Sequence, residues 1–161
     1  MCPFCGDFEE TGRDVLQEYV DSGTVQVRYH VLSILDDQSS TQYSTRAANA
    51  QAVVLDTSGP DVAAKFHDLL FENQPEEGSA GLSDDELVDL AVQAGATEAE
   101  VARGIEDREF EQWVKNGTDQ ASKDDVTSTP TVKVNDTTVE SQTIEGLVAS
   151  MAKEIDAASG S

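Results

Sequence analysis

Two cysteines near the start of the chain, Cys2 and Cys5, are separated by Pro3 and Phe4 and constrain the fold more than any other feature. Three positions apart on the first turn of a helix, their sulfurs lie close enough for a disulfide, and Pro3 has the φ that this turn requires. The unpaired N–H groups and the positive dipole end at a helix start favour a thiolate, so we expect the pKa of the more exposed thiol to fall. We therefore predict Cys2 as the nucleophile, and Cys5, one turn deeper, as the thiol that resolves a mixed disulfide formed at Cys2.

Two other interpretations of the cysteine pair compete with redox exchange. A structural zinc site needs four ligands, and the remaining candidates, His30 and His67, lack the spacing of a zinc-binding histidine pair. As an edge histidine, His67 also needs no functional explanation. The pair could instead form a static structural disulfide, although a two-residue spacing suits redox chemistry better. We favour thiol–disulfide exchange, which requires neither a metal nor an organic cofactor.

The composition is that of an acidic chain with enough apolar residues for one sizeable core. Among 161 residues, 38% are hydrophobic, and 10 Lys and Arg stand against 32 Asp and Glu, giving a formal net charge of −22. Such a surface repels phosphate backbones and anionic lipids, which argues against nucleic-acid binding and electrostatic membrane docking. The scarcity of lysine suits a salty or extracytoplasmic setting, and a well-solvated surface is the simpler interpretation. No apolar run is long enough to span a membrane.

Apolar periodicity predicts helices at both ends and in the middle of the chain, with strands between them. Ser83 with Glu86 and Thr97 with Glu100 match capping boxes at the starts of two short helices. Asn135-Asp136 is a plausible hairpin turn. The expected elements are a helix over 2–20, a strand over 24–33, helices over 44–56, 62–70 (capped by Asp61), 84–94, 98–105 and 107–123, strands over 131–134 and 137–140, and a helix over 144–155, with fraying from Ala157 to Ser161.

A second motif, Ser128-Thr129-Pro130-Thr131-Val132, precedes the predicted hairpin. Together with the cysteine motif it makes the chain resemble the DsbA-like family of thioredoxin-fold disulfide oxidoreductases over nearly its whole length. The amino-acid sequence of residues 43–50 and 66–71 most resembles that of actinobacterial family members, which are exported or membrane-anchored. The resemblance implies an α/β, thioredoxin-like fold with an inserted α-helical domain. We expect a single domain over 1–161, with thioredoxin-like parts 1–42 and 127–161 and a helical insertion over 43–126.

The resemblance also assigns a role to the Thr129-Pro130 pair. In the family a cis-proline precedes the penultimate strand, and Pro130 falls at that position. A cis bond there would present the backbone N–H and C=O groups of Thr129 beside Cys2, where an extended substrate peptide could pair like an added strand. The alternative is a proline that merely begins a strand.

The family implies oxidation of substrate dithiols outside the cytoplasm, in the cell envelope or in secreted form. Its partners would be cysteine-containing protein substrates and a membrane quinone-linked protein that reoxidises the cysteine pair. A reductase or isomerase of the same fold is compatible with Thr129, whereas a glutaredoxin would be shorter and lack the helical insertion. A protein of another functional class, a non-catalytic interaction module, would use the two cysteines only as a structural disulfide.

One departure from the family pattern concerns the segment before the cysteines. Family members carry a β-strand there, in the middle of the sheet, and often an acidic residue before the motif. Loss of a central strand leaves ladder groups unpaired on both neighbours, at about 1–3 kcal/mol for each buried group. We therefore expect this chain to be part of a longer or differently started polypeptide with an upstream strand and an export or membrane signal, and we assign no buried proton acceptor.

Overall fold

The computed structural model describes residues 1–160, and these divide into two compact units. The cysteine unit comprises residues 2–29 together with the residues from 126 onward, and the helical unit comprises Met1 with residues 30–125. Each unit has its own cluster of buried apolar side chains. The expected organisation as one domain with an insertion over 43–126 remains a prediction.

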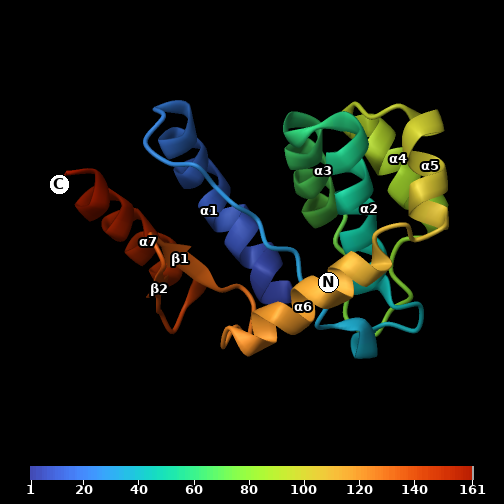
Figure 1. Cartoon of the computed structure of the whole chain (residues 1–161). Helices are drawn as coiled ribbons and strands as arrows, with labels where there is room; N and C mark the ends of the chain where they lie inside the picture. The colour runs from blue at the N-terminus through green and yellow to red at the C-terminus, as the bar shows by residue number, and fades with distance from the viewer. Residues whose placement is uncertain (161) are drawn as a thin grey trace. The chain divides into compact units, whose positions relative to one another are not determined.

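The cysteine unit is built from two helices and a hairpin: α1 (Pro3–Asp21), β1 (Val132–Val134), β2 (Thr137–Val139) and α7 (Ile144–Ser159) (Figure 1). β1 and β2 are antiparallel, with Val132 opposite Val139. Asn135 and Asp136 join them with φ values of 47° and 67°. Two residues with positive φ form the turn that matches the twist of a hairpin, so the predicted hairpin is confirmed.

The core of the cysteine unit forms where α7 packs against α1 and the hairpin. A β-carbon at Gly12 would lie 3.3 Å from Cγ2 of Val148, so glycine permits the close approach of α7 to α1. α7 continues to Ser159, beyond the predicted fraying at Ala157, and Ser161 lies outside the described residues. The buried apolar side chains of this core are Phe8, Val139, Leu147, Val148, Met151 and Ile155.

The predicted strand over residues 24–33 is wrong. In the described part of the chain the only ladder is the one between β1 and β2, and residues 24–33 contain no strand. Alternating apolar residues predict which side chains face a core, but a strand also needs a neighbour that accepts its backbone hydrogen bonds. Near α1 this segment bonds instead to the helix end, where the amides of Thr24 and Val25 donate to the carbonyl oxygen of Tyr19.

The helical unit surrounds α2 (Tyr43–Ser58), which packs against every other α-helix of that unit (Figure 1). The predicted helix ending at Lys123 is confirmed, but it begins at Glu111 rather than at residue 107, because residues 107–110 form a turn in which Arg108 has a φ of 53°. The remaining elements are η1 (Asp36–Gln38), α3 (Pro60–Glu72), α4 (Asp84–Ala94), α5 (Glu98–Glu106) and α6 (Glu111–Lys123). Among residues 1–160, no helix combines the length and the apolar character needed to cross a membrane.

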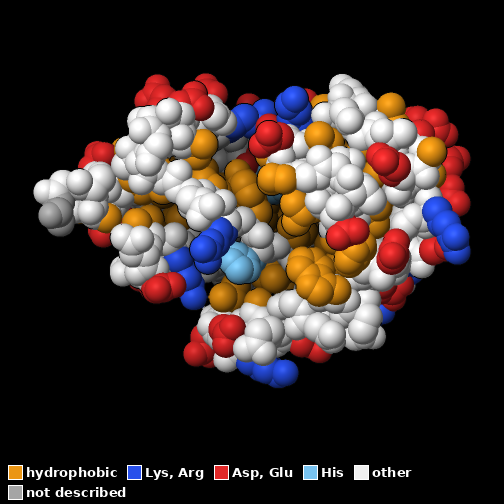
Figure 2. All heavy atoms as spheres, turned by 45° about the horizontal axis from the view of Figure 1, so that its top comes forward, with side chains coloured by type: hydrophobic (Ala, Val, Ile, Leu, Met, Phe, Trp, Pro, Cys, Tyr) orange, Lys and Arg blue, Asp and Glu red, His pale blue; other side chains and the backbone are white. Residues whose placement is uncertain are grey.

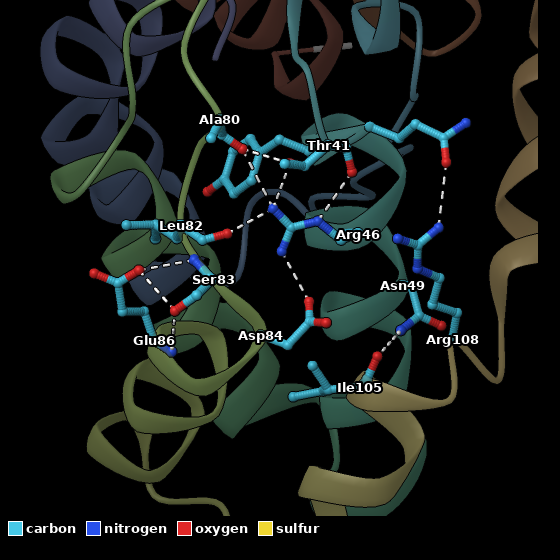
Figure 3. Close-up of polar contacts among 12 residues, drawn as sticks. Thr41, Arg46, Asn49, Ala80, Leu82, Ser83, Asp84, Glu86, Ile105 and Arg108 are labelled. Carbon is cyan, nitrogen blue, oxygen red and sulfur yellow. Dashed lines mark hydrogen bonds and ion pairs between the residues drawn. The ribbon is translucent and has the colours of Figure 1, made fainter.

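The two predicted capping boxes have different outcomes. At α4 the box is complete: the Glu86 amide donates to the Ser83 hydroxyl, and the Ser83 amide donates to the Glu86 carboxylate (Figure 3). At α5 the Thr97 side chain makes no capping hydrogen bond. There the Glu100 amide donates to the Thr97 backbone carbonyl, so the donor that a capping side chain would use already has a partner.

Arg46, on α2, is 6% exposed and holds two loops of the helical unit together (Figure 3). Its guanidinium donates to the backbone carbonyls of Thr41, Ala80 and Leu82. It also donates to the Asp84 carboxylate at 2.8 Å. A buried guanidinium needs such a set of acceptors because desolvation of its charge is costly.

Candidate active site

Cys2 is the N-cap residue of α1, and Pro3 is the first residue of the helix. The Cys2 carbonyl accepts hydrogen bonds from the amides of Cys5 and Gly6, at 3.1 and 3.2 Å, so the motif itself begins the helix. The first turn contains no acidic side chain, which would otherwise repel a thiolate. The predicted position of the pair at a helix start is confirmed.

The second motif lies beside the first. The Thr129–Pro130 peptide bond is cis. The Cys2 thiol donates a hydrogen bond to the Thr129 carbonyl oxygen, with Sγ and O 3.6 Å apart. The fold of the cysteine unit therefore brings Thr129, from the loop before β1, against the start of α1.

Cys5, half-buried like Cys2, lies one turn further into α1. The pKa of the Cys5 thiol is raised to about 12, chiefly by burial, while the Thr129 side chain opposes this rise and the neighbouring Cys2 adds to it. Burial has this effect because a low-dielectric surrounding disfavours the charged thiolate. At neutral pH Cys5 is accordingly a protonated thiol, and both cysteines are present as thiols in this structure.

Phe4, between the cysteines, is 62% exposed. Pro3 is exposed as well, so both residues of the central dipeptide are accessible to a reaction partner. Such a ring can cover the apolar part of a peptide without hydrogen bonding to it.

The two histidines considered as zinc ligands lie in the helical unit. His67 is buried, with its ring centroid 4.9 Å from that of Phe71. Among residues 1–160 there is no group of three or more His, Cys, Asp or Glu side chains placed to hold a metal ion.

The arrangement is suited to thiol–disulfide exchange, because it combines an accessible thiol at a helix start with a second thiol one turn away. The sequence placed Thr129 near Cys2 only through a family resemblance, and it missed the contact between the Thr129 side chain and Cys5. The sequence feature that could have indicated this contact is a threonine directly before Pro130. The separation of Cys5 and Thr129 along the chain does not reveal that they lie close together in the fold.

Comparison with known proteins shows which families and structures this chain is similar to. A protein-family model described as Thioredoxin matches residues 1–153. The reduced form of the disulfide bond oxidoreductase DsbG from Mycobacterium tuberculosis has a TM-score of 0.80 and 33% sequence identity, covering 99% of this chain and 79% of that one. Reduced DsbA from the same organism has a TM-score of 0.78 and 32% identity, covering 99% of this chain and 83% of that one.

A curated relative is much longer than this chain. The serine/threonine-protein kinase PknE from Mycobacterium tuberculosis is 40% identical over 100 residues, which is 60% of this chain and 18% of the kinase. The similarity thus concerns a small part of that protein.

Proposed function

This chain belongs to the thioredoxin family and is a thiol–disulfide oxidoreductase of the DsbA type, and from that premise we propose that it oxidises the dithiols of exported proteins through Cys2 and Cys5. The hydrogen bond from the Cys2 thiol to the Thr129 carbonyl supports the oxidising direction. Only the dithiol state can make this bond, since a disulfide sulfur carries no proton. Interactions that stabilise the reduced form of such a pair make its disulfide a stronger oxidant.

The start of α1 adds to the same preference. When the Cys2 proton leaves and its bond to Thr129 is lost, the backbone N–H groups of the first turn and the helix dipole are placed to stabilise the thiolate, which again exists only after reduction. The dipeptide between the cysteines contributes no hydrogen-bonding side chain. Pro3 and Phe4 therefore leave thiolate stabilisation to the backbone.

The transfer proceeds in two exchanges. A substrate thiolate attacks Sγ of Cys2, the Cys2–Cys5 bond breaks, and the Cys5 sulfur leaves with the electron pair and takes up a proton. A second substrate thiolate then attacks the substrate sulfur of the mixed disulfide and releases Cys2. The substrate loses two electrons and two protons, and the cysteine pair gains them.

Thr129 and Pro130 hold the substrate during these exchanges. An extended peptide pairs with the backbone of Thr129 beside Cys2, and the proline leaves the sulfur without a competing backbone donor. Cysteine-containing proteins outside the cytoplasm are the substrates, and a membrane quinone-linked partner reoxidises the pair, as in the DsbA-like family.

The decisive measurement is the reduction potential of the Cys2/Cys5 pair. The protein is equilibrated in graded glutathione buffers, and the remaining thiols are trapped and counted, with a Cys5→Ala variant as the background. A potential of about −120 mV is the expected result for a dithiol oxidase. A potential of about −270 mV would instead identify the protein as a reductant and overturn the proposed oxidase function.

A further inference from the structure

Carboxylates line the helix that carries the reactive cysteine. Asp7 and Glu10 are exposed on α1, about 7.5 and 12 Å from Cys2 along the helix axis at 1.5 Å per residue. The first Lys or Arg on the helix is Arg13, about 16.5 Å from Cys2 along the axis and so beyond both carboxylates. These rises along the axis are lower limits for the separations, and the Debye length is about 30 Å at 0.01 M salt, so at low ionic strength the charges on Asp7 and Glu10 act on a peptide bound at Cys2.

The rest of the cysteine unit does not reverse this charge. On the hairpin, Lys133 of β1 is accompanied by Asp136 in the turn and Glu140 just after β2. The chain as a whole carries a formal net charge of −22. On the face shown in Figure 2, Asp and Glu side chains are spread widely, whereas Lys and Arg gather at a few places.

Besides these negative charges, the active site offers an exposed apolar side chain, that of Phe4. The ring of Phe4 is 62% exposed and lies between the two cysteines in the sequence. The exposed ring, two residues from Cys2, is available to a peptide whose cysteine is attached to Cys2. An apolar side chain next to that cysteine would bury surface against it.

We propose that this active site selects cysteine-containing peptides that are positively charged near the cysteine and carry an apolar residue beside it. The inference rests on the proposed function only in taking Cys2 as the sulfur that exchanges with the substrate. Lysine residues in the peptide are attracted to the carboxylates of Asp7 and Glu10, which follow the first turn of α1, and glutamates are repelled. Two unit charges 8 Å apart in water interact by an amount that changes a rate about twofold, so several such pairs give about tenfold at low salt.

The test uses a reaction that does not depend on redox direction. A Cys5→Ala variant keeps Cys2 alone, and it is mixed with peptides whose single cysteine carries a thionitrobenzoate disulfide. The Cys2 thiolate attacks the peptide sulfur, the peptide–thionitrobenzoate bond breaks, and the coloured thiolate leaves with the electron pair. Two peptides are compared that are identical except for two lysines or two glutamates flanking the cysteine.

We expect the lysine peptide to react about tenfold faster at 20 mM salt and the ratio to fall toward one at 0.5 M salt. Replacing a phenylalanine beside the peptide cysteine by serine should slow the reaction about threefold. Equal rates for the two charged peptides at low salt, or a ratio that salt does not change, would overturn the charge preference. A reductive potential in the glutathione titration would instead refute the oxidase proposal and leave this rate ratio intact.

Two double variants distinguish the effect of charges close to Cys2 from the effect of the net charge of the protein. Asp7→Asn with Glu10→Gln removes two charges close to Cys2, and the rate ratio should fall to about threefold. Glu18→Gln with Asp21→Asn removes two charges from the same helix, about 24 and 28 Å from Cys2 along its axis. This distal pair should leave the ratio close to tenfold, and an equal fall in both variants would refute the local selection.

Discussion

The side chain of Thr129, far from Cys5 in the sequence, opposes the effect of burial on the pKa of the Cys5 thiol. Burial is the larger effect and raises the pKa of Cys5 to about 12. At neutral pH Cys5 is therefore a neutral thiol, and the Thr129 side chain favours its ionisation when it attacks a mixed disulfide.

The reactivity of Cys5 should follow this raised pKa. In a Cys2→Ala variant the burial of Cys5 remains, so its thiolate fraction should rise about tenfold per pH unit across pH 7–10 without levelling off. Iodoacetamide labelling followed by mass spectrometry measures this rate. The same protein unfolded in urea should level off near pH 9, and a plateau at that pH in the folded protein would contradict the prediction.

Thr129→Val should slow the attack of Cys5 on a mixed disulfide at Cys2. The substitution keeps the backbone carbonyl and the side-chain shape but removes one hydrogen bond to the developing thiolate, so we expect a reduction of about two- to tenfold. Release of glutathione from glutathionylated Cys2 gives the rate. Thr131→Val is the matched control, because the Thr131 hydroxyl donates to the Ser128 carbonyl in the same loop. An equal effect of both substitutions would point to the loop structure instead.

Arg46→Met should lower the free energy of unfolding by about 3–5 kcal/mol. It leaves the Asp84 carboxylate and the loop carbonyls without their buried donor. Arg103→Met is the comparison, since the ion pair of Arg103 with Asp107 is exposed and should contribute less than about 1 kcal/mol. Urea denaturation measures both, and similar losses in the two variants would refute the role of Arg46.

Gly81→Ala should destabilise the helical unit far more than Gly78→Ala. Both glycines have positive φ, 71° and 84°, so both substitutions incur backbone strain of about 1–2 kcal/mol. A β-carbon at Gly81 would also overlap the Tyr43 ring, whereas one at Gly78 would meet nothing within 4 Å. The difference between the two melting temperatures isolates the collision, and equal melting temperatures would contradict it.

Local sequence patterns were sufficient for most helices and for the hairpin. The apolar stripe of the last helix and the Asn135-Asp136 turn depend on residues within a few positions of one another, and both are found as predicted. Helix starts were less reliable. Ser83 caps its helix with its side chain, but Thr97 does not, because a backbone carbonyl already holds the relevant amide.

By itself, the sequence determined that Cys2 and Cys5 would share the first turn of a helix, since their spacing and Pro3 are local properties. Only the tertiary structure decided that Thr129 would contact both cysteines and that residues 24–33 would form no ladder. Periodicity specifies which face of an element is apolar. Hydrogen bonds between distant segments depend on which partners the folded chain brings within reach, and no local pattern encodes that.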